Sequence, residues 1–226
     1  MELRVITNVF ILLMMFLLTG TVCAQDPVKL NPDAYKVALE NEYVRVLDIT
    51  LKPGVEHPMH SHPNAYIYFL SDGHLTMKHP EHGKRSVNVH KGRNFWSGPE
   101  THSLDSNNAE QVRIVVFEIK KQVNKGNSVE LAPHDVAPDT NSLIYENAFI
   151  RVTETITPPG GGGTLHEHIS MAVYSVTACK IEITDEDGNS RIVELKPGMA
   201  IWSPPVKHRV KNIGETTTHL LHVEVK

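Results

Sequence analysis

An internal duplication constrains the fold of this chain more than any other feature. Residues 32–120 return as residues 138–226 at a constant shift of 106 positions, without insertion or deletion. About 20 identical pairs fall along the two copies, which is typical of tandem copies of one structural unit. The chain is therefore expected to fold into two similar domains. A residue kept in both copies is a candidate for a shared role.

The most informative repeated residues are histidines. They are His60, His62 and His102 in the first copy and His166, His168 and His208 in the second. Residues two apart on a strand point to the same face, and a third histidine can reach that face from another strand. Three converging imidazoles suit Zn, Fe, Mn, Ni or Cu. Each copy is therefore predicted to bind a divalent metal, and the pattern leaves the identity of the metal open.

Composition narrows the function classes. Of the 226 residues, 40% are hydrophobic and 21% are charged, as in ordinary globular proteins. The net charge of −4 and the absence of a Lys/Arg cluster argue against a nucleic-acid partner. The 14 histidines are the outlier, and histidine is the commonest metal ligand among side chains.

Residues 1–24 are predicted to be a secretory signal peptide. Residues 9–18 form an apolar run that is short for a membrane span, and small residues precede Gln25. An uncleaved anchor helix is the alternative. The mature protein is thus expected to be secreted or periplasmic and free of the membrane. Loss of Cys23 with the signal would leave Cys179 without a disulfide partner.

The pattern within each copy is that of β-structure. Short β-branched runs are expected as strands at residues 43–51, 65–70, 112–119, 150–156, 171–176, 180–184, 190–195 and 219–225. Gly and Pro separate these runs, and no sustained helical period appears, which indicates an all-β sandwich or barrel. The expected domains are residues 32–121 and 138–226, with a polar linker at residues 122–137.

The repeated motifs resemble those of the cupin superfamily. Its first motif matches Gly54, His60, His62 and Gly73. Its second motif is approximated by Gly92, Pro99 and His102, and again by Gly198, Pro204, His208 and Asn212. The resemblance covers nearly all of the mature chain and implies a bicupin, that is, two tandem antiparallel β jelly-roll barrels. It further implies a divalent metal and a small-molecule ligand or substrate in each barrel, and pairing through sheet edges into a homodimer.

The chain departs from the cupin pattern at the motif glutamate. That residue would fall at Tyr66 in the first copy and at Ala172 in the second. A three-His set then remains, as in the cysteine-dioxygenase and diketone-cleaving cupins, and the obvious general base is lost. Because Tyr66 has the parity of His60 and His62, it is expected to point into the first cavity. It is the one candidate catalytic side chain there, with a core aromatic as the alternative.

Three further expectations concern the surroundings of the two sites. The first cavity should be the better equipped, since the second offers Ala172 where the first has Tyr66. His57 should lie at the surface, because Gly163 replaces it in the second copy. His222 shares the parity of Glu224, a position expected to face solvent.

Two classes of function follow from these residues. The first is a secreted metal-dependent enzyme that acts on a small molecule, by dioxygenase-like chemistry with Fe(II) or by isomerase or lyase chemistry with Zn or Mn. The alternative is a non-catalytic module that binds a sugar, a carboxylate or the metal itself. Inward-pointing polar groups beyond the metal ligands would favour the enzyme.

Overall fold

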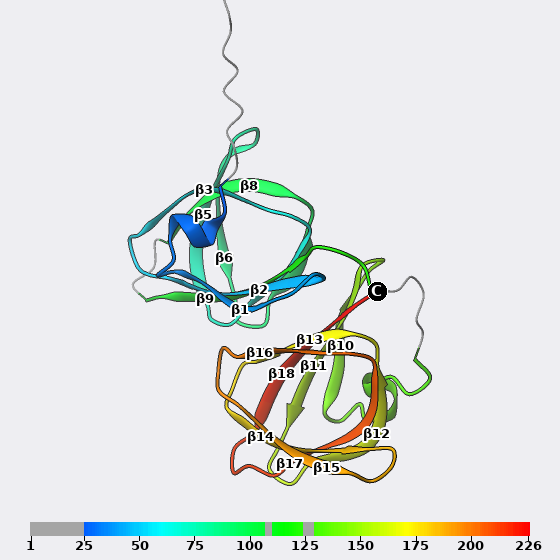
Figure 1. Ribbon diagram of the computed structural model, residues 1–226. Coiled ribbons are helices and arrows are strands. Elements are labelled where there is room, and N and C mark those ends of the chain that lie inside the picture. The colour runs from blue at the N-terminus through cyan, green and yellow to red at the C-terminus, as the bar shows by residue number, and fades with distance from the viewer. Residues whose placement is uncertain (1–24, 107–109, 124–128) are drawn as a thin grey trace, which may run out of the picture.

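The computed structural model describes residues 25–106, 110–123 and 129–226. Two barrels lie one above the other, and the C-terminus ends between them (Figure 1). No helix within the described residues is long and apolar enough to span a bilayer. The expected signal peptide at residues 1–24 lies outside the described part of the chain.

The first barrel begins with one helical turn, α1 Pro27–Leu30, which Asp26 caps through the backbone N–H of Val28. Its strands are β1 Tyr35–Glu40, β2 Val44–Leu51, β3 Glu56–His62, β4 Ala65–Phe69, β5 Gly73–His79, β6 Gly83–Val89, β7 Asn94–Ser97, β8 Glu100–Ser106 and β9 Val112–Ile119. They pair antiparallel, in the orders β1-β2-β9-β4-β7 and β3-β8-β5-β6. The two sheets face each other across the barrel interior.

The second barrel repeats this plan. It begins with α2 Pro133–Val136. Its strands are β10 Asn141–Glu146, β11 Ile150–Thr157, β12 Gly162–His168, β13 Met171–Ser175, β14 Cys179–Asp185, β15 Ser190–Leu195, β16 Ala200–Ser203, β17 Val206–Asn212 and β18 Thr218–Val225. The sheet orders are β10-β11-β18-β13-β16 and β12-β17-β14-β15. The prediction of two tandem all-β barrels is confirmed, and α2 places a helical turn of the second barrel inside the stretch expected as linker.

The barrels pack through their five-stranded sheets, so the central strands of each are buried on both faces. In β4, the inward residues Ala65 and Ile67 belong to the interior of the first barrel, while Tyr66 and Tyr68 belong to an apolar cluster between the barrels. That cluster also takes the outward residues of β2 and β9 and their counterparts in β11, β13 and β18. Burial of this apolar area between sheets is the main force that joins the barrels.

The contacts between the barrels follow the repeat and are related by an approximate two-fold axis. Tyr68 Oη donates to Glu154 Oε1 over 2.6 Å, and Tyr174 Oη donates to Asp48 Oδ2 over 3.0 Å. Each of these pairs maps onto the other at the shift of 106. Two stacked ring pairs are related in the same way by the shift of 106. They are Trp96 with Phe149 and Tyr43 with Trp202. The interface is therefore isologous, like that of a symmetric dimer.

Candidate metal centres and the cavity of the second barrel

The first group of histidines lies at the end of the first barrel where β3 and β8 pair. His60 lies directly opposite His102 in the ladder, and His62 points to the same face two residues on. The ring centroid of His60 lies 4.9 Å from that of His62 and 4.7 Å from that of His102. All three side chains are buried.

The second group has the same construction. His166 pairs with His208 across β12 and β17, and His168 follows on the same face. The corresponding centroid distances are 5.1 Å and 4.7 Å. In each group, one ligand atom per residue lies within 4.8 Å of the other two. The structure thus brings together all six histidines predicted as metal ligands, as two separate triads.

The hydrogen bonds of the triads leave ring nitrogens free for a metal. The Nδ1–H of His60 donates to the carbonyl oxygen of Pro58 over 2.7 Å, and that of His166 donates to Thr164 over 2.8 Å. A carbonyl oxygen only accepts, so in both rings Nε2 carries the lone pair. His60 Nε2 and His208 Nε2 are buried without a partner among the described residues. A divalent cation between the three rings would satisfy these atoms, so the residues present fit a metal.

A buried glutamate orients one ligand in each triad. His62 Nδ1 donates to Glu118 Oε1 over 2.7 Å, and His168 Nδ1 donates to Glu224 Oε1 over 2.9 Å. An arginine stands behind the second carboxylate, with Arg151 Nε 2.8 Å from Glu224 Oε2. Carboxylates in this position fix the tautomer of a ligating histidine and raise its basicity. Burial raises the pKa of Glu224 to about 7, and the Arg151 guanidinium opposes that shift.

Burial keeps the imidazoles neutral, which is the form that binds metal. Desolvation lowers the pKa of His60 to about 4 and the pKa values of His168 and His208 to about 3. The neighbouring imidazoles add to each of these shifts. At neutral pH these three ligands therefore need no deprotonation before a cation enters.

The two barrels differ in what surrounds the triad. The first encloses a cavity of only about 60 Å³, whereas the second contains one of about 530 Å³. Several interior residues of the first barrel have smaller or polar counterparts in the second. Tyr35 corresponds to Asn141, Ile49 to Thr155, Leu51 to Thr157, and Val116 to His222. The second interior is thus hollow because the repeat replaces bulky apolar side chains there. The expectation that the first cavity is the better equipped was wrong.

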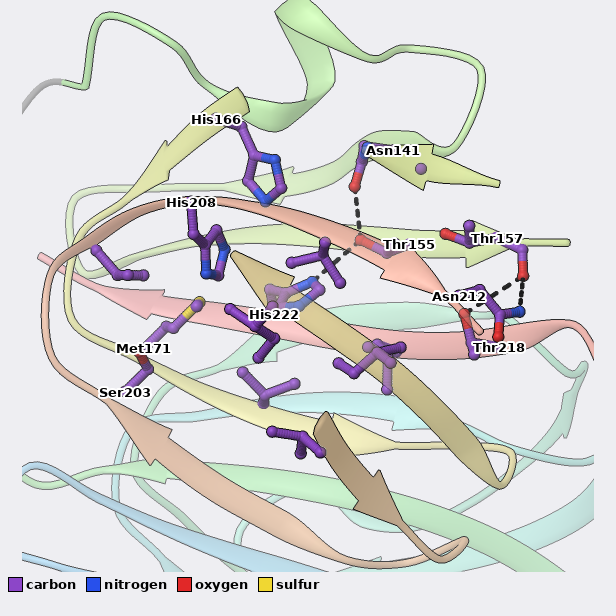
Figure 2. Close-up of a pocket in the computed structure, with 18 of the residues that line it drawn as sticks. Asn141, Thr155, Thr157, His166, Met171, Ser203, His208, Asn212, Thr218 and His222 are labelled. Carbon is purple, nitrogen blue, oxygen red and sulfur yellow. Dashed lines mark hydrogen bonds between the residues drawn. The ribbon is translucent and has the colours of Figure 1, made fainter. Parts of the chain in front are cut away.

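The cavity of the second barrel has one polar and one apolar side (Figure 2). Asn141, Thr155 and His222 lie beside the triad and are joined by hydrogen bonds. The ring of His222 stacks on His168, with centroids 5.1 Å apart. The apolar side consists of Met171, Val173, Ile181, Ile183, Val193, Leu195, Ile201, Val206, Val210 and Leu220. Arg191 also lines the cavity, and none of the described Asp or Glu residues does.

Tyr66 does not reach the first triad. Its ring lies in the cluster between the barrels, 6.2 Å from the ring of Phe117 and 5.5 Å from that of Tyr145. The expectation that Tyr66 points into the first cavity was wrong because the chain bends at residues 63–64, between β3 and β4. The alternation along β3 therefore does not continue into β4, and no contact of Tyr66 supports a catalytic role.

The expectations for two other histidines were also wrong. His57 is buried, not exposed: its Nδ1 accepts from Asn31 Nδ2 over 3.3 Å, and its ring packs on that of Tyr35. His222 does share the parity of Glu224, but both face the interior of the second barrel. A five-stranded sheet that buries both faces leaves neither position to solvent.

Comparison with known proteins agrees with this geometry. Residues 153–224 match the model of the family described as Cupin domain. The second barrel is a cupin domain. Residues 153–224 contain all three histidines of its triad, Glu224, and most of the residues that line the large cavity. The first barrel shares the sheet orders and the triad of this cupin domain through the internal repeat.

Solved structures share the fold of most of this chain. Oxalate decarboxylase of Bacillus subtilis, studied for its Mn(II) centres, is 15% identical, with a TM-score of 0.56 over 81% of this chain and 69% of that one. Oxalate decarboxylase of Lactobacillus farciminis, in a formate complex, is 16% identical, with the same TM-score, over 81% and 77% of the two chains. A single cupin domain of Bordetella pertussis Tohama I is 27% identical over 38% of this chain and 91% of its own, with a TM-score of 0.36. No curated protein matches significantly.

The interpretation of the sequence missed Glu118 and Glu224, although a signal for them was present. They are identical residues at the shift of 106, like the six histidines. Arg45 and Arg151, which also match at the shift of 106, lie behind these carboxylates, with Arg45 Nη1 3.6 Å from Glu118 Oε2. An acidic residue kept in both copies within a run of apolar strand residues is a candidate partner of a buried histidine.

Replacing Glu224 by glutamine is expected to weaken metal binding in the second cupin domain about 10- to 100-fold, because the amide orients His168 without raising its basicity. Competition of the purified protein with a chromogenic Zn chelator measures the change. Glu118→Gln is the matched variant and should weaken only the site in the first barrel. Unaltered affinity at both sites in folded variants would contradict the assigned role of these carboxylates.

Stability of the metal-free protein should fall as the pH is lowered. The folded-state pKa values of about 4 for His60 and about 3 for His168 and His208 lie below the unfolded value of 6.5. The unfolded chain therefore binds more protons below pH 6.5, so stability is lost as pH falls from there toward the folded values. At pH 5 the loss should reach at least about 2 kcal/mol.

Urea denaturation in the presence of EDTA at pH 7 and pH 5 measures this loss. His208→Gln should reduce the difference between the two pH values, because the titrating imidazole is gone. An equal free energy of unfolding at both pH values in the native sequence would show that the triads are already protonated, or solvated, in the folded chain.

Proposed function

We propose that the chain is a secreted metal-dependent enzyme that acts on a small organic molecule, and that its active site is the cavity of the second barrel. One observation carries this proposal. The triad of His166, His168 and His208 opens onto a cavity of about 530 Å³ with a polar wall, whereas the otherwise equal triad of the first barrel opens onto about 60 Å³. Cavities of several hundred Å³ are the size at which proteins bind small ligands.

Three protein ligands leave coordination positions for substrate, which is the arrangement of catalytic rather than structural metal sites. A divalent metal held there would supply Lewis acidity or, if it is redox-active, oxygen chemistry. Thr164 and Glu224 hold the rings of His166 and His168 from behind, so the ligand geometry is set before substrate enters. The apolar side of the cavity excludes water from the substrate.

The absence of carboxylates from the described cavity lining favours one reaction type. Isomerases and lyases move protons and need a strong general base close to the substrate. No Asp or Glu among the described residues lines this cavity, and the carboxylate of Glu224 behind the triad already contacts His168 and Arg151. We therefore favour dioxygenase-like chemistry on a substrate that chelates the metal, ahead of isomerase or lyase chemistry.

The first barrel contributes a closed site. Its cavity is lined largely by apolar residues, with Tyr35 over His60 and Glu100 beside His102. The space inside the barrel beside this triad is only about 60 Å³, and a shallower hollow of about 430 Å³ that shares Met77, Ser97 and Glu100 with it lies outside the barrel interior. We propose that this triad stabilises the fold and takes no part in the reaction.

The relation to oxalate decarboxylases does not extend to their substrate. Oxalate has six non-hydrogen atoms and would leave most of the second cavity unfilled. The shared fold at 15–16% identity is therefore combined here with a cavity suited to a larger and less polar molecule.

Oxygen consumption tests the proposal. Protein without residues 1–24, loaded anaerobically with Fe(II), is mixed with a panel of hydroxy acids, oxo acids and diketones in an oxygen electrode, and products are identified by mass spectrometry. His168→Ala should abolish uptake, while the matched variant His62→Ala should leave it largely intact. Uptake that depends on His62 instead would move the active site to the first barrel.

A non-catalytic role is the second candidate, because the same lack of carboxylates suits a binding protein. It predicts tight binding of a ligand from the panel by the metal-loaded protein with no oxygen consumption and no product. Loss of the metal from the second triad under every loading condition would remove the enzymatic proposal.

A further inference from the structure

The polar wall of the second cavity forms a hydrogen-bonded series whose direction is fixed at one end. Asn141 Nδ2 donates to the carbonyl oxygen of Ala137 over 3.0 Å, so the amide of Asn141 can have only one orientation. Its Oδ1 then accepts from Thr155 Oγ1 over 2.7 Å. The single hydroxyl proton of Thr155 is donated to Asn141, so Thr155 Oγ1 can only accept a further hydrogen bond.

That direction determines the tautomer of His222. Thr155 Oγ1 lies 3.1 Å from His222 Nδ1, and because the threonine can only accept, the proton of a neutral ring must lie on Nδ1. His222 Nε2 is then an acceptor. The ring lines the cavity beside His168, and the backbone of Thr153 is its second polar neighbour besides Thr155. The wall therefore presents a hydrogen-bond acceptor to whatever binds next to the metal.

The repeat shows that this series is specific to the second barrel. The first barrel has Tyr35, Ile49 and Val116 at these positions, and Asn31 in place of Ala137. The five-stranded sheet therefore folds without the polar series. Polar side chains that core packing does not require are typical of ligand recognition.

The charges around the cavity limit the ligand further. The only charged side chain on the described lining is that of Arg191, and the triad has no carboxylate ligand to offset a divalent cation. This end of the cavity is electropositive and attracts an anion. The rest of the lining is mainly apolar side chains of β13 to β18, together with the polar residues Thr157, Asn212 and Thr218.

We infer that the cavity of the second barrel binds a small hydroxylated organic anion, in which a carboxylate lies at the metal and Arg191, a hydroxyl donates to His222 Nε2, and an apolar chain or ring fills the rest. This inference rests on the proposed function, since it names the class of molecule that the same site takes. Thr155 and Asn141 act as positioning residues through His222.

Calorimetric titration of the Zn-loaded protein tests the inference without turnover. The probes are 2-hydroxyhexanoate, 2-oxohexanoate, which chelates but has no hydroxyl proton, and 1,2-hexanediol, which has no charge. The native protein should bind the hydroxy acid about tenfold more tightly than the oxo acid, the size of one hydrogen bond, and more tightly than the diol by at least as much. Equal affinities for the hydroxy and oxo acids, or for the acid and the diol, would overturn it.

Three variants test whether the preference for the hydroxy acid over the oxo acid depends on the hydrogen-bonded series of Asn141, Thr155 and His222. His222→Val and Thr155→Val should bring the ratio between hydroxy and oxo acid close to one, and the first barrel shows that valine is tolerated at the position of His222. Thr157→Val is the matched control, because Thr157 lines the same cavity from the same strand and its hydroxyl takes no part in the series. A preference that survives His222→Val would also overturn the inference.

Retention of Zn and binding of the organic probes are separate outcomes of this experiment. If the second triad retains no Zn, the proposed function falls, and the ligand class is still decided on the metal-free protein by the same comparison of hydroxy acid, oxo acid and diol. If Zn is retained and none of the probes binds, the metal site stands and the inference on the ligand fails.

Discussion

His166→Ala is expected to lower the metal content of the purified protein from about two ions per chain to about one. Two histidines cannot hold a divalent cation against buffer as three can, so affinity at the second triad should fall by at least about a hundredfold. Elemental analysis after dialysis against a weak chelator measures the loss. His60→Ala should remove the ion of the first barrel instead, and the double variant should retain neither.

Two control variants test whether metal is lost for a reason other than removal of a ligand. His222→Val changes an imidazole that lies against His168 but belongs to neither triad, so it should keep both ions. His166→Gln keeps a polar side chain of similar length in the event that alanine disturbs the barrel. Two ions retained by well-folded His166→Ala would show that the second triad is not a metal site.

Gly162→Ala is expected to lower the free energy of unfolding by at least about 3 kcal/mol, from backbone strain and steric overlap together. Gly162 has a φ of +90°, and a Cβ added there would overlap the carbonyl oxygen of Val210 on the neighbouring strand. β12 would have to move away from β17, and with it His166 and His168. Urea denaturation of the metal-loaded protein measures the effect.

Gly163→Ala is the matched control for this prediction. Gly163 has a φ of +96°, but a Cβ there has no neighbour within 4 Å. This variant should therefore cost only the strain of the left-handed conformation, about 1–2 kcal/mol. If both variants lose the same stability, close packing of Gly162 against β17 is not what the site requires.

The sequence predicted most of the fold because its signals are local and are repeated. Each strand expected from a β-branched run is present within a few residues of its predicted bounds, for example residues 112–119 as β9. The six histidines could be grouped without a structure because the i, i+2 pattern and the constant shift of 106 both act on the same residues.

The errors at the site have one physical origin. Alternation along a strand shows which residues share a face, but it distinguishes inside from outside only when one face is polar. β4 and β18 are largely buried on both faces, so Tyr66 and Glu224 could not be placed by polarity. The bend at residues 63–64 then changed which face of β4 continued that of His60 and His62.

What the sequence by itself determined is the duplication, the β-class of both halves and the two histidine triads, since each of these depends on spacing along the chain. What only the tertiary structure decided is which barrel is hollow. The replacement of Tyr35 by Asn141 or Ile49 by Thr155 is visible in the aligned copies. Its consequence depends on all these side chains meeting in one interior, because a cavity is the volume that several distant strands together fail to fill.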